Sequence, residues 1–225
     1  MRKIFLSTLV VFAALITISS CKKDEDAKTY AKVLVTHASP DAPGVDLLVD
    51  NSKQNSAALT FPNSTAYLQV ESGSRNIKVN VAGTSTTVID ANLTLEKDKN
   101  YSVFAVDSVS KISAVVIEDD LTTPASGKAH VRFVHLSPNA PAVDVAVAGG
   151  GPVVFANKSF KEYTAFTPLD AGSYNLEVRV AGTSTVALTL PTITLESGKI
   201  YTVFAKGFLG GSADQALGAQ IIANN

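Results

Sequence analysis

The sequence predicts an all-β protein that consists of two tandem antiparallel β-sandwich domains, with about seven strands in each. Three observations support this prediction. A ten-residue stretch, 37–46, returns at 135–144 with seven identical positions. Apolar and polar residues alternate with the two-residue period of β-strands in many short runs after residue 30. No stretch beyond the first twenty residues shows a sustained helical period.

The N-terminal residues predict export and a lipid anchor. Arg2 and Lys3 precede an apolar run of 15 residues, 4–18, which is shorter than the about 20 residues that a membrane-spanning helix needs. The run ends in Ile-Ser-Ser-Cys21, which resembles the lipobox of bacterial lipoproteins and contains the only cysteine of the chain. We therefore expect a signal peptide over 1–20 and a lipid on Cys21. An ordinary signal peptide with a chance cysteine is the alternative.

A charged tether is expected to follow the anchor, over residues 21–30. The run Lys-Lys-Asp-Glu-Asp at 22–26 is too polar to fold alone. It is similar to the lysine-then-acidic tag that sends some lipoproteins to the outer face of the outer membrane, although a generic hydrophilic spacer accounts for it almost as well. The expected location is the cell envelope, as an outer-membrane lipoprotein that is a candidate for surface exposure.

Composition argues against two classes of function. Removal of Arg2 and Lys3 with the leader leaves 19 − 2 = 17 basic and 20 acidic groups, a net charge of −3. Nucleic-acid binding needs a basic surface, so no nucleic-acid partner is expected. Because the cysteine lies in the leader, the folded part has no disulfide and no thiolate metal site.

Each repeat begins with a strand, a proline-rich corner and a second strand. In the first copy, 31–37 and 45–50 alternate, while Ser-Pro-Asp-Ala-Pro between them breaks the pattern because proline cannot donate to a ladder. The copies continue to correspond after this unit, and Ala-Gly-Thr-Ser-Thr at 82–86 returns at 181–185. The offset between the copies grows from 98 to 100 residues, as expected when single residues are gained in loops.

Similar runs define the remaining strands and the domain limits. The expected domains are 31–120 and 129–225, joined by a linker at 121–128 that has Thr-Pro-Ala-Ser-Gly composition. Immunoglobulin-like and transthyretin-like sandwiches both fit this number of strands. The expected strands are 31–37, 45–50, 65–70, 74–81, 86–94, 100–106 and 112–118, then 129–135, 143–148, 164–168, 173–180, 185–194, 200–206 and 216–223.

The repeated motif His-x-Ser-Pro-x-Ala-Pro-x-Val-Asp resembles the domain-of-unknown-function family 4397, which is found in tandem in bacterial secreted and anchored proteins. The resemblance covers nearly the whole mature chain, and both copies keep the motif. It implies an extracytoplasmic β-sandwich, and no activity, cofactor or site residue can be carried over from it.

The most conspicuous polar residues of the repeats are His37 and Asp46, with His135 and Asp144 in the second copy. A metal or catalytic site would need more ligands or a nucleophile beside each pair, and the acidic Asp41 becomes Asn139 in the second copy. We interpret these four residues as structural: each histidine should hydrogen-bond the proline corner, and each aspartate should bond backbone amides there. No catalytic residue, metal or cofactor is expected.

Three weaker candidates remain open. Glu118, Asp119 and Asp120 could bind calcium at the domain junction, although a solvated linker explains them better. Ser39 and Ser137 lack a nucleophile-elbow context. Three aromatic residues are candidates for exposed binding platforms, but the absence of tryptophan weakens a carbohydrate-binding interpretation. They are Tyr163, Phe166 and Tyr174.

If successive strands alternate in direction, loops 38–44, 71–73 and 95–99 share one end of the first domain, and loops 51–64, 82–85 and 107–111 share the end nearest the membrane. By this logic the second corner points away from the membrane and forms an exposed tip with residues 196–199. The candidate binding residues at this tip are Ser137, Pro138, Asn139 and Pro141.

The function expected from the sequence is non-enzymatic. A cell-envelope lipoprotein, held in the membrane through Cys21, would present two interaction modules to an envelope protein or a glycan. A structural spacer in an envelope assembly is the alternative, and a metal-assisted hydrolase is less favoured. A contiguous exposed aromatic or apolar patch would favour binding over spacing.

Overall fold

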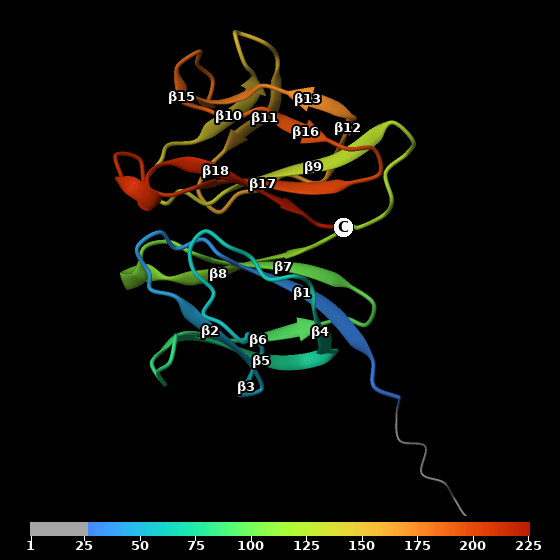
Figure 1. The fold of residues 1–225 in the computed structure, drawn as a ribbon, viewed down its shortest axis with the longest axis vertical. Coiled ribbons are helices and arrows are strands. Elements are labelled where there is room, and N and C mark those ends of the chain that lie inside the picture. Colours follow the sequence, from blue (N-terminus) through green and yellow to red (C-terminus); the bar gives the residue numbers. More distant parts are fainter. Residues whose placement is uncertain (1–26) are drawn as a thin grey trace, which may run out of the picture.

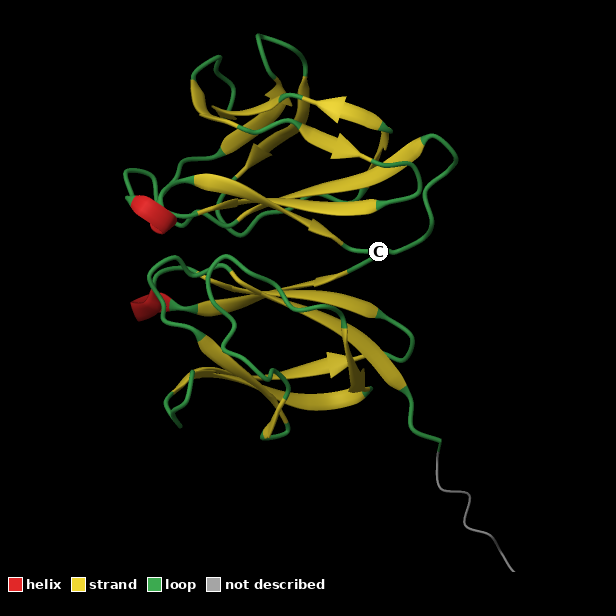
Figure 2. Cartoon of the chain, viewed as in Figure 1, coloured by secondary structure: helices red, strands yellow, loops and turns green. Residues whose placement is uncertain are grey.

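A computed structural model describes residues 27–225, which form two β-sandwich domains. The first contains β1–β8 and the second contains β9–β18 (Figure 1). The helical segments of this part of the chain are two short 3-10 turns, η1 (Val109–Lys111) and η2 (Ala213–Gln215) (Figure 2). The prediction of an all-β chain with two sandwiches is confirmed.

The first domain pairs an inner sheet, which faces the second domain, with an outer sheet. The order of the inner sheet is β4-β1-β7-β8, and that of the outer sheet is β3-β2-β5-β6. The strands are β1 (Tyr30–His37), β2 (Val45–Val49), β3 (Ser52–Lys53), β4 (Leu68–Glu71), β5 (Gly73–Val81), β6 (Thr87–Leu95), β7 (Asn100–Val106) and β8 (Ser113–Glu118).

The second domain repeats this plan. Its inner sheet has the order β12-β9-β17-β18 and its outer sheet the order β11-β10-β14-β15, beside a two-stranded sheet of β13 and β16. The strands are β9 (Lys128–His135), β10 (Val143–Val147), β11 (Val153–Lys158), β12 (Thr167–Asp170), β13 (Gly172–Tyr174), β14 (Leu176–Val180), β15 (Val186–Thr189), β16 (Ile193–Leu195), β17 (Ile200–Lys206) and β18 (Gly218–Ala223).

One pair in each inner sheet is parallel, which differs from the alternating order assumed from the sequence. β1 pairs with β7, and β9 pairs with β17, because the chain passes through the outer sheet before it returns. All other strand pairs among the described residues are antiparallel. Strands β3 and β11 were not expected, since neither shows sustained alternation of apolar and polar residues.

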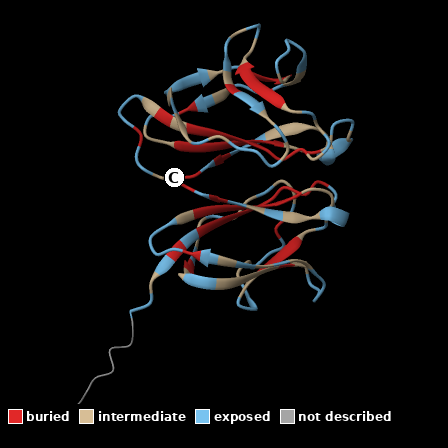
Figure 3. Ribbon diagram, turned by 180° about the vertical axis from the view of Figure 1, so that it is seen from behind, coloured by how far each residue is buried: buried red, intermediate tan, exposed pale blue. Residues whose placement is uncertain are grey.

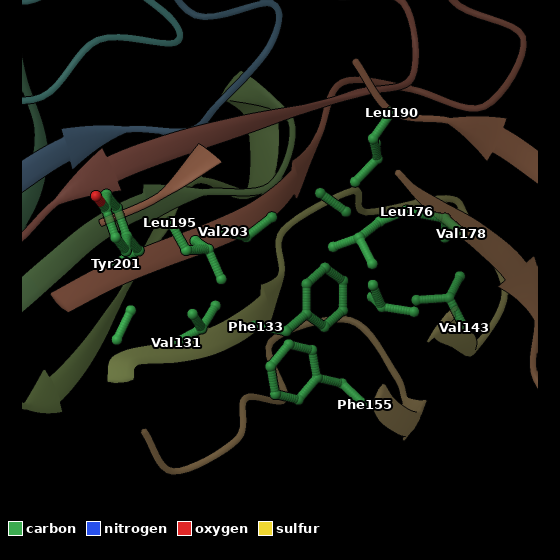
Figure 4. Close-up of a cluster of buried hydrophobic side chains, with 13 residues drawn as sticks. Val131, Phe133, Val143, Phe155, Leu176, Val178, Leu190, Leu195, Tyr201 and Val203 are labelled. Atoms are coloured by element: carbon green, nitrogen blue, oxygen red, sulfur yellow. The ribbon is translucent and has the colours of Figure 1, made fainter. Parts of the chain in front are cut away.

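Each domain encloses its own apolar core between its two sheets. In the second domain the rings of Phe133 and Phe155 stack, with centroids 6.4 Å apart, in the centre of the cluster that Figure 4 shows. The corresponding core of the first domain is built from aliphatic side chains of both sheets and from Tyr101. These cores account for the alternation on the strands of both outer sheets.

A third apolar cluster lies between the domains. The two inner sheets pack face to face, so their central strands are buried on both sides (Figure 3). The fully buried rings of Phe104 and Phe204 meet edge to face, with centroids 6.1 Å apart. The buried members of this interdomain cluster are Leu34, Ala38, Phe104, Val106, Ile117, Val134, Leu136, Phe204 and Ile222.

Candidate functional site

The predicted lipidation site, Cys21, lies outside the described residues, as do the signal peptide and the charged run. The expectation of a lipid anchor therefore stays a prediction. Among residues 27–225 no helix has the length and apolar character needed to span a membrane.

Each repeated histidine lies at the end of its strand and is fully buried under the proline corner. His37 Nε2 is 3.0 Å from the carbonyl oxygen of Pro43, and His135 Nε2 is 3.0 Å from that of Pro141. A carbonyl oxygen can only accept, so Nε2 carries the proton in both rings. Burial lowers the pKa of both histidines, against the smaller opposite effect of these hydrogen bonds. The neutral rings thus hydrogen-bond the proline corners and hold them in place, which is the contact that the sequence predicted for these histidines.

The paired aspartates bond backbone amides, but those of the Ala-Gly-Thr-Ser-Thr turn rather than the proline corner. Asp46 Oδ2 accepts from the Gly83 amide at 3.0 Å, and Asp144 Oδ2 accepts from the Gly182 amide at 2.9 Å. Lys53 also lies 2.8 Å from Asp46, and its hydrogen bond is the main cause that lowers the pKa of this carboxyl, followed by the Gly83 amide. The corner and the turn are therefore linked at the same end of each sandwich.

The candidate binding residues of the second corner are less accessible than expected. Ser137 is fully buried and its hydroxyl donates to the Gly207 carbonyl at 2.6 Å. Asn139 is exposed, but its amide group bonds both the nitrogen and the carbonyl oxygen of Leu209, at 2.8 and 3.0 Å. Pro138 is half-buried and Pro141 is exposed. The prediction that Ser137 is a freely exposed contact is wrong, because the corner folds back on the loop after β17.

Position 41 shows why aspartate and asparagine exchange between the copies. Asp41 Oδ1 accepts from the Val109 amide at 2.8 Å, as Asn139 Oδ1 does from the amide of Leu209. Either side chain supplies the oxygen that holds the loop after β7 or β17. The role is structural and needs no charge.

The predicted tip does not form. The Gly198 amide bonds the Lys128 carbonyl oxygen at the start of β9, so residues 196–199 lie at the opposite end of the second domain from the corner, which follows His135. Likewise Asp98 bonds Tyr30 at the start of β1, whereas Ala82 bonds Gly44 in the first corner. The predicted distribution of loops between the two ends is wrong, because the parallel β1–β7 and β9–β17 pairs reverse the assumed order.

The acidic residues at the domain junction are already engaged, which argues against the calcium interpretation. Glu118 pairs with Lys99 at 2.6 Å, and Asp120 accepts from the Thr122 amide at 3.0 Å. Asp119 is buried against the second domain. Residues 27–225 contain no group of three or more His, Cys, Asp or Glu side chains with the spacing of a metal site.

A buried polar cluster between the domains was missed from the sequence. Arg132 Nη1 lies 2.6 Å from Asp119 Oδ1, and both side chains are at most 1% exposed. The guanidinium also donates to Ser102 of the first domain and Thr202 of the second, each at 2.8 Å. The signal available in the sequence was the alignment of Arg132 with an apolar residue, Leu34, at the same position of the first copy.

Of the three aromatic candidates, one is exposed. Tyr163 is 46% exposed, and Tyr174 is half-buried. Phe166 is half-buried, and its ring centroid lies 4.5 Å from Cζ of Arg132, so it packs against the buried polar cluster. The three do not form one platform.

The exposed parts of the two repeated motifs come together at one end of the molecule. We call this the corner end, and define it as loops 38–44, 82–86, 136–142 and 181–185. Backbone hydrogen bonds from Ala82 to Gly44 and from Ala181 to Ala142 join the loops within each domain. β1 and β9 both run toward the side of η1 and η2, so the two sets of loops face the same way (Figure 1).

Comparison with known proteins gives a family and a remote structural likeness. The model of the domain of unknown function DUF4397 matches residues 31–146 and again residues 147–225. No curated protein matches the chain. A solved structure of the family CBM26 module CBMbc from Eubacterium rectale Amy13K, in complex with maltoheptaose, is similar with 10% identity and a TM-score of 0.29, over 85% of this chain and 96% of that chain.

Proposed function

The chain belongs to the DUF4397 family, and from this premise we propose that it is a non-catalytic lipoprotein of the cell envelope. Cys21 carries the lipid, and the two sandwiches present the corner end to a protein or glycan partner. The observation that carries this proposal is the convergence of the exposed repeated loops at the end opposite the start of β1 at Tyr30. An anchor that precedes β1 would leave this end facing away from the membrane.

The arrangement of the domains supports a binding role over a spacer. A spacer gains reach when its domains follow one another end to end, whereas here the domains lie side by side, with their inner sheets packed face to face (Figure 2). Val109 and Leu209, which lie beside the two corners, are 39% and 47% exposed and add apolar side chains next to the corner end.

The anchor is tested by metabolic labelling with an alkyne fatty acid. The wild-type chain should take up the label, and Cys21→Ala should not. Protease treatment of intact cells should then release a fragment that contains both domains. A label that persists in Cys21→Ala, or a chain that resists the protease in intact cells but is cut after purification, would contradict the surface lipoprotein.

Binding is tested with the purified mature chain on intact cells, envelope fragments and glycan arrays. Ser85→Lys with Ser184→Lys alters exposed turns of the corner end, and Glu96→Lys with Glu196→Lys adds the same number of lysines at the opposite end. We expect any saturable binding to fall at least tenfold in the first variant and to persist in the second. Equal losses in both, or no saturable binding to any of the three, would refute the role of the corner end.

A further inference from the structure

The two domains face each other through equivalent surfaces. The strand register shows which residues of the edge strands β8 and β18 correspond. Tyr101 pairs with Glu118 in the first domain, and the equivalent Tyr201 pairs with Ala223 in the second, so Glu118 corresponds to Ala223. Corresponding residues then meet near a pseudo-two-fold axis, as the rings of Phe104 and Phe204 do. The corresponding pairs are Leu34 with Arg132, Tyr67 with Phe166, Ser102 with Thr202, Phe104 with Phe204, and Asp119 with Asn224.

The charges in this interface break the symmetry. The second domain supplies Arg132 and the first supplies Asp119, whereas the corresponding positions hold the neutral Leu34 and Asn224. The ion pair is therefore made once and not twice. Leu34 packs in the apolar cluster instead.

The remaining polar groups complete a closed network around this pair. Asp119 Oδ2 accepts from the hydroxyls of Ser102 and Tyr67, both in the first domain. Asn224 Nδ2 donates to the Tyr67 hydroxyl at 3.0 Å across the interface, and Asn224 Oδ1 accepts from the Thr202 hydroxyl at 2.7 Å. Burial, and then the charge of Asp119, raise the pKa of Tyr67, which remains a neutral donor. Each member of the charged pair therefore finds its opposite charge only when a first domain meets a second domain.

Pairing of like domains would leave these charges without partners. Two first domains would bury Asp119 against Leu34, and two second domains would bury Arg132 against Asn224. A buried charge that loses its partner is strongly unfavourable, whereas the apolar part of the interface would tolerate either combination.

We propose that the Arg132–Asp119 ion pair determines which domains associate. It allows the inner-sheet face of each domain to bind a domain of the other type and disfavours binding to a domain of its own type. The partner that this face fits is the opposite domain of the same chain. The apolar cluster holds the faces together, and the charges select the combination.

The experiment uses the folded full-length mature chain, cut after folding. A protease site is inserted between the exposed residues Thr122 and Thr123 of the connection, where an insertion is well tolerated. After cleavage, the two halves are unfolded in urea and refolded together by dilution, and native mass spectrometry then distinguishes the three pair types by mass. We expect the cut wild-type protein to give pairs of a first with a second domain only, where indifferent pairing would put about half of the pairs in like combinations.

Asp119→Asn with Arg132→Leu gives each domain the residue that its counterpart already holds. This variant should form pairs of like domains beside the mixed pairs. If the first variant does not fold, Asp119→Asn with Arg132→Gln replaces it in the same experiment, because it removes both charges and keeps polar groups at both positions. Lys99→Leu with Glu118→Asn removes an exposed ion pair beside the interface and should behave as the wild type.

Three outcomes would overturn the proposal. Like pairs in the cut wild-type protein would show that the charges do not select. Mixed pairs alone in both neutral variants would assign the selection to shape. Separation of the cut wild-type halves into single domains would show that the face is not a self-sufficient interface.

Discussion

At the scale of single residues, the buried histidines link stability to pH. Burial lowers the pKa of His37 and His135, so the unfolded chain binds more protons than the native chain below the ordinary histidine pKa. The stability that these neutral rings contribute is complete above a pH of about 6.5 and is lost as the pH falls from there toward the lowered folded pKa.

We expect the free energy of unfolding to fall between pH 7.5 and 5, by at most about 1.4 kcal/mol per pH unit for each histidine. His37→Gln should cost about 1–3 kcal/mol at pH 7.5, through the bond to Pro43, and should remove its share of this slope. His130→Gln, at a half-buried position with no such bond to a corner, is the control. Urea titrations at several pH values measure both effects, and an unchanged slope in His37→Gln would contradict the assignment.

Residue types alone predicted part of this chemistry. The repeated histidine before a proline corner indicated a local hydrogen bond, and the bonds to Pro43 and Pro141 have this form. The amide partners of Asp46 could not be predicted, because Gly83 is distant in sequence and reaches the aspartate only through the pairing of β2 with β5. The burial of Arg132 could not be predicted from its own strand, because the first domain is what covers it.

At the scale of elements, the inner strands differ from the outer ones in what covers them. Runs such as Val33-Leu34-Val35 in β1 are apolar on consecutive residues, which is typical of strands buried on both faces. This pattern correctly predicted strands, but they were expected in two separate sandwiches, and the second sheet that covers their outer face was not predicted. In the second domain β15 ends at Thr189 and β16 begins at Ile193, on either side of Pro191. Proline cannot donate to a ladder, so the strand that is continuous as β6 in the first domain is divided here.

Strand β18 offers a test of this two-sided burial with neighbouring isoleucines. Ile222 belongs to the interdomain cluster and is 9% exposed, whereas Ile221 faces the open side of its own sandwich and is 38% exposed. We expect Ile222→Lys to destabilise the protein by more than about 3 kcal/mol, because it buries a charge without a partner. Ile221→Lys should cost less than about 1 kcal/mol. Urea unfolding measures both, and equal costs would contradict the burial of β18 against the first domain.

At the scale of the whole molecule, the interdomain cluster makes the two sandwiches one structural body. The sequence predicted two domains and a linker, and it could not predict their packing, because the contacts that join them come from strands far apart along the chain. Equivalent faces that are apolar in both copies indicate that these faces are buried, but they do not show which surface covers them. Only the asymmetry between Leu34 and Arg132 hinted that the two faces have different environments.

We expect the two domains to unfold together, so a core mutation in one domain should also lower the stability of the other. Phe155→Ala removes a buried ring from the core of the second domain and should cost about 3–5 kcal/mol. If first-domain amides exchange only when the whole body opens, those of β1 should exchange about a hundredfold to several thousandfold faster in this variant, as hydrogen-exchange mass spectrometry would measure. Val186→Ala, at a 45% exposed position of the same domain, should leave them unchanged. Wild-type protection of β1 in Phe155→Ala would instead mean that the first domain remains folded alone, with the apolar face around Phe104 open to solvent, which the burial of that face makes unfavourable.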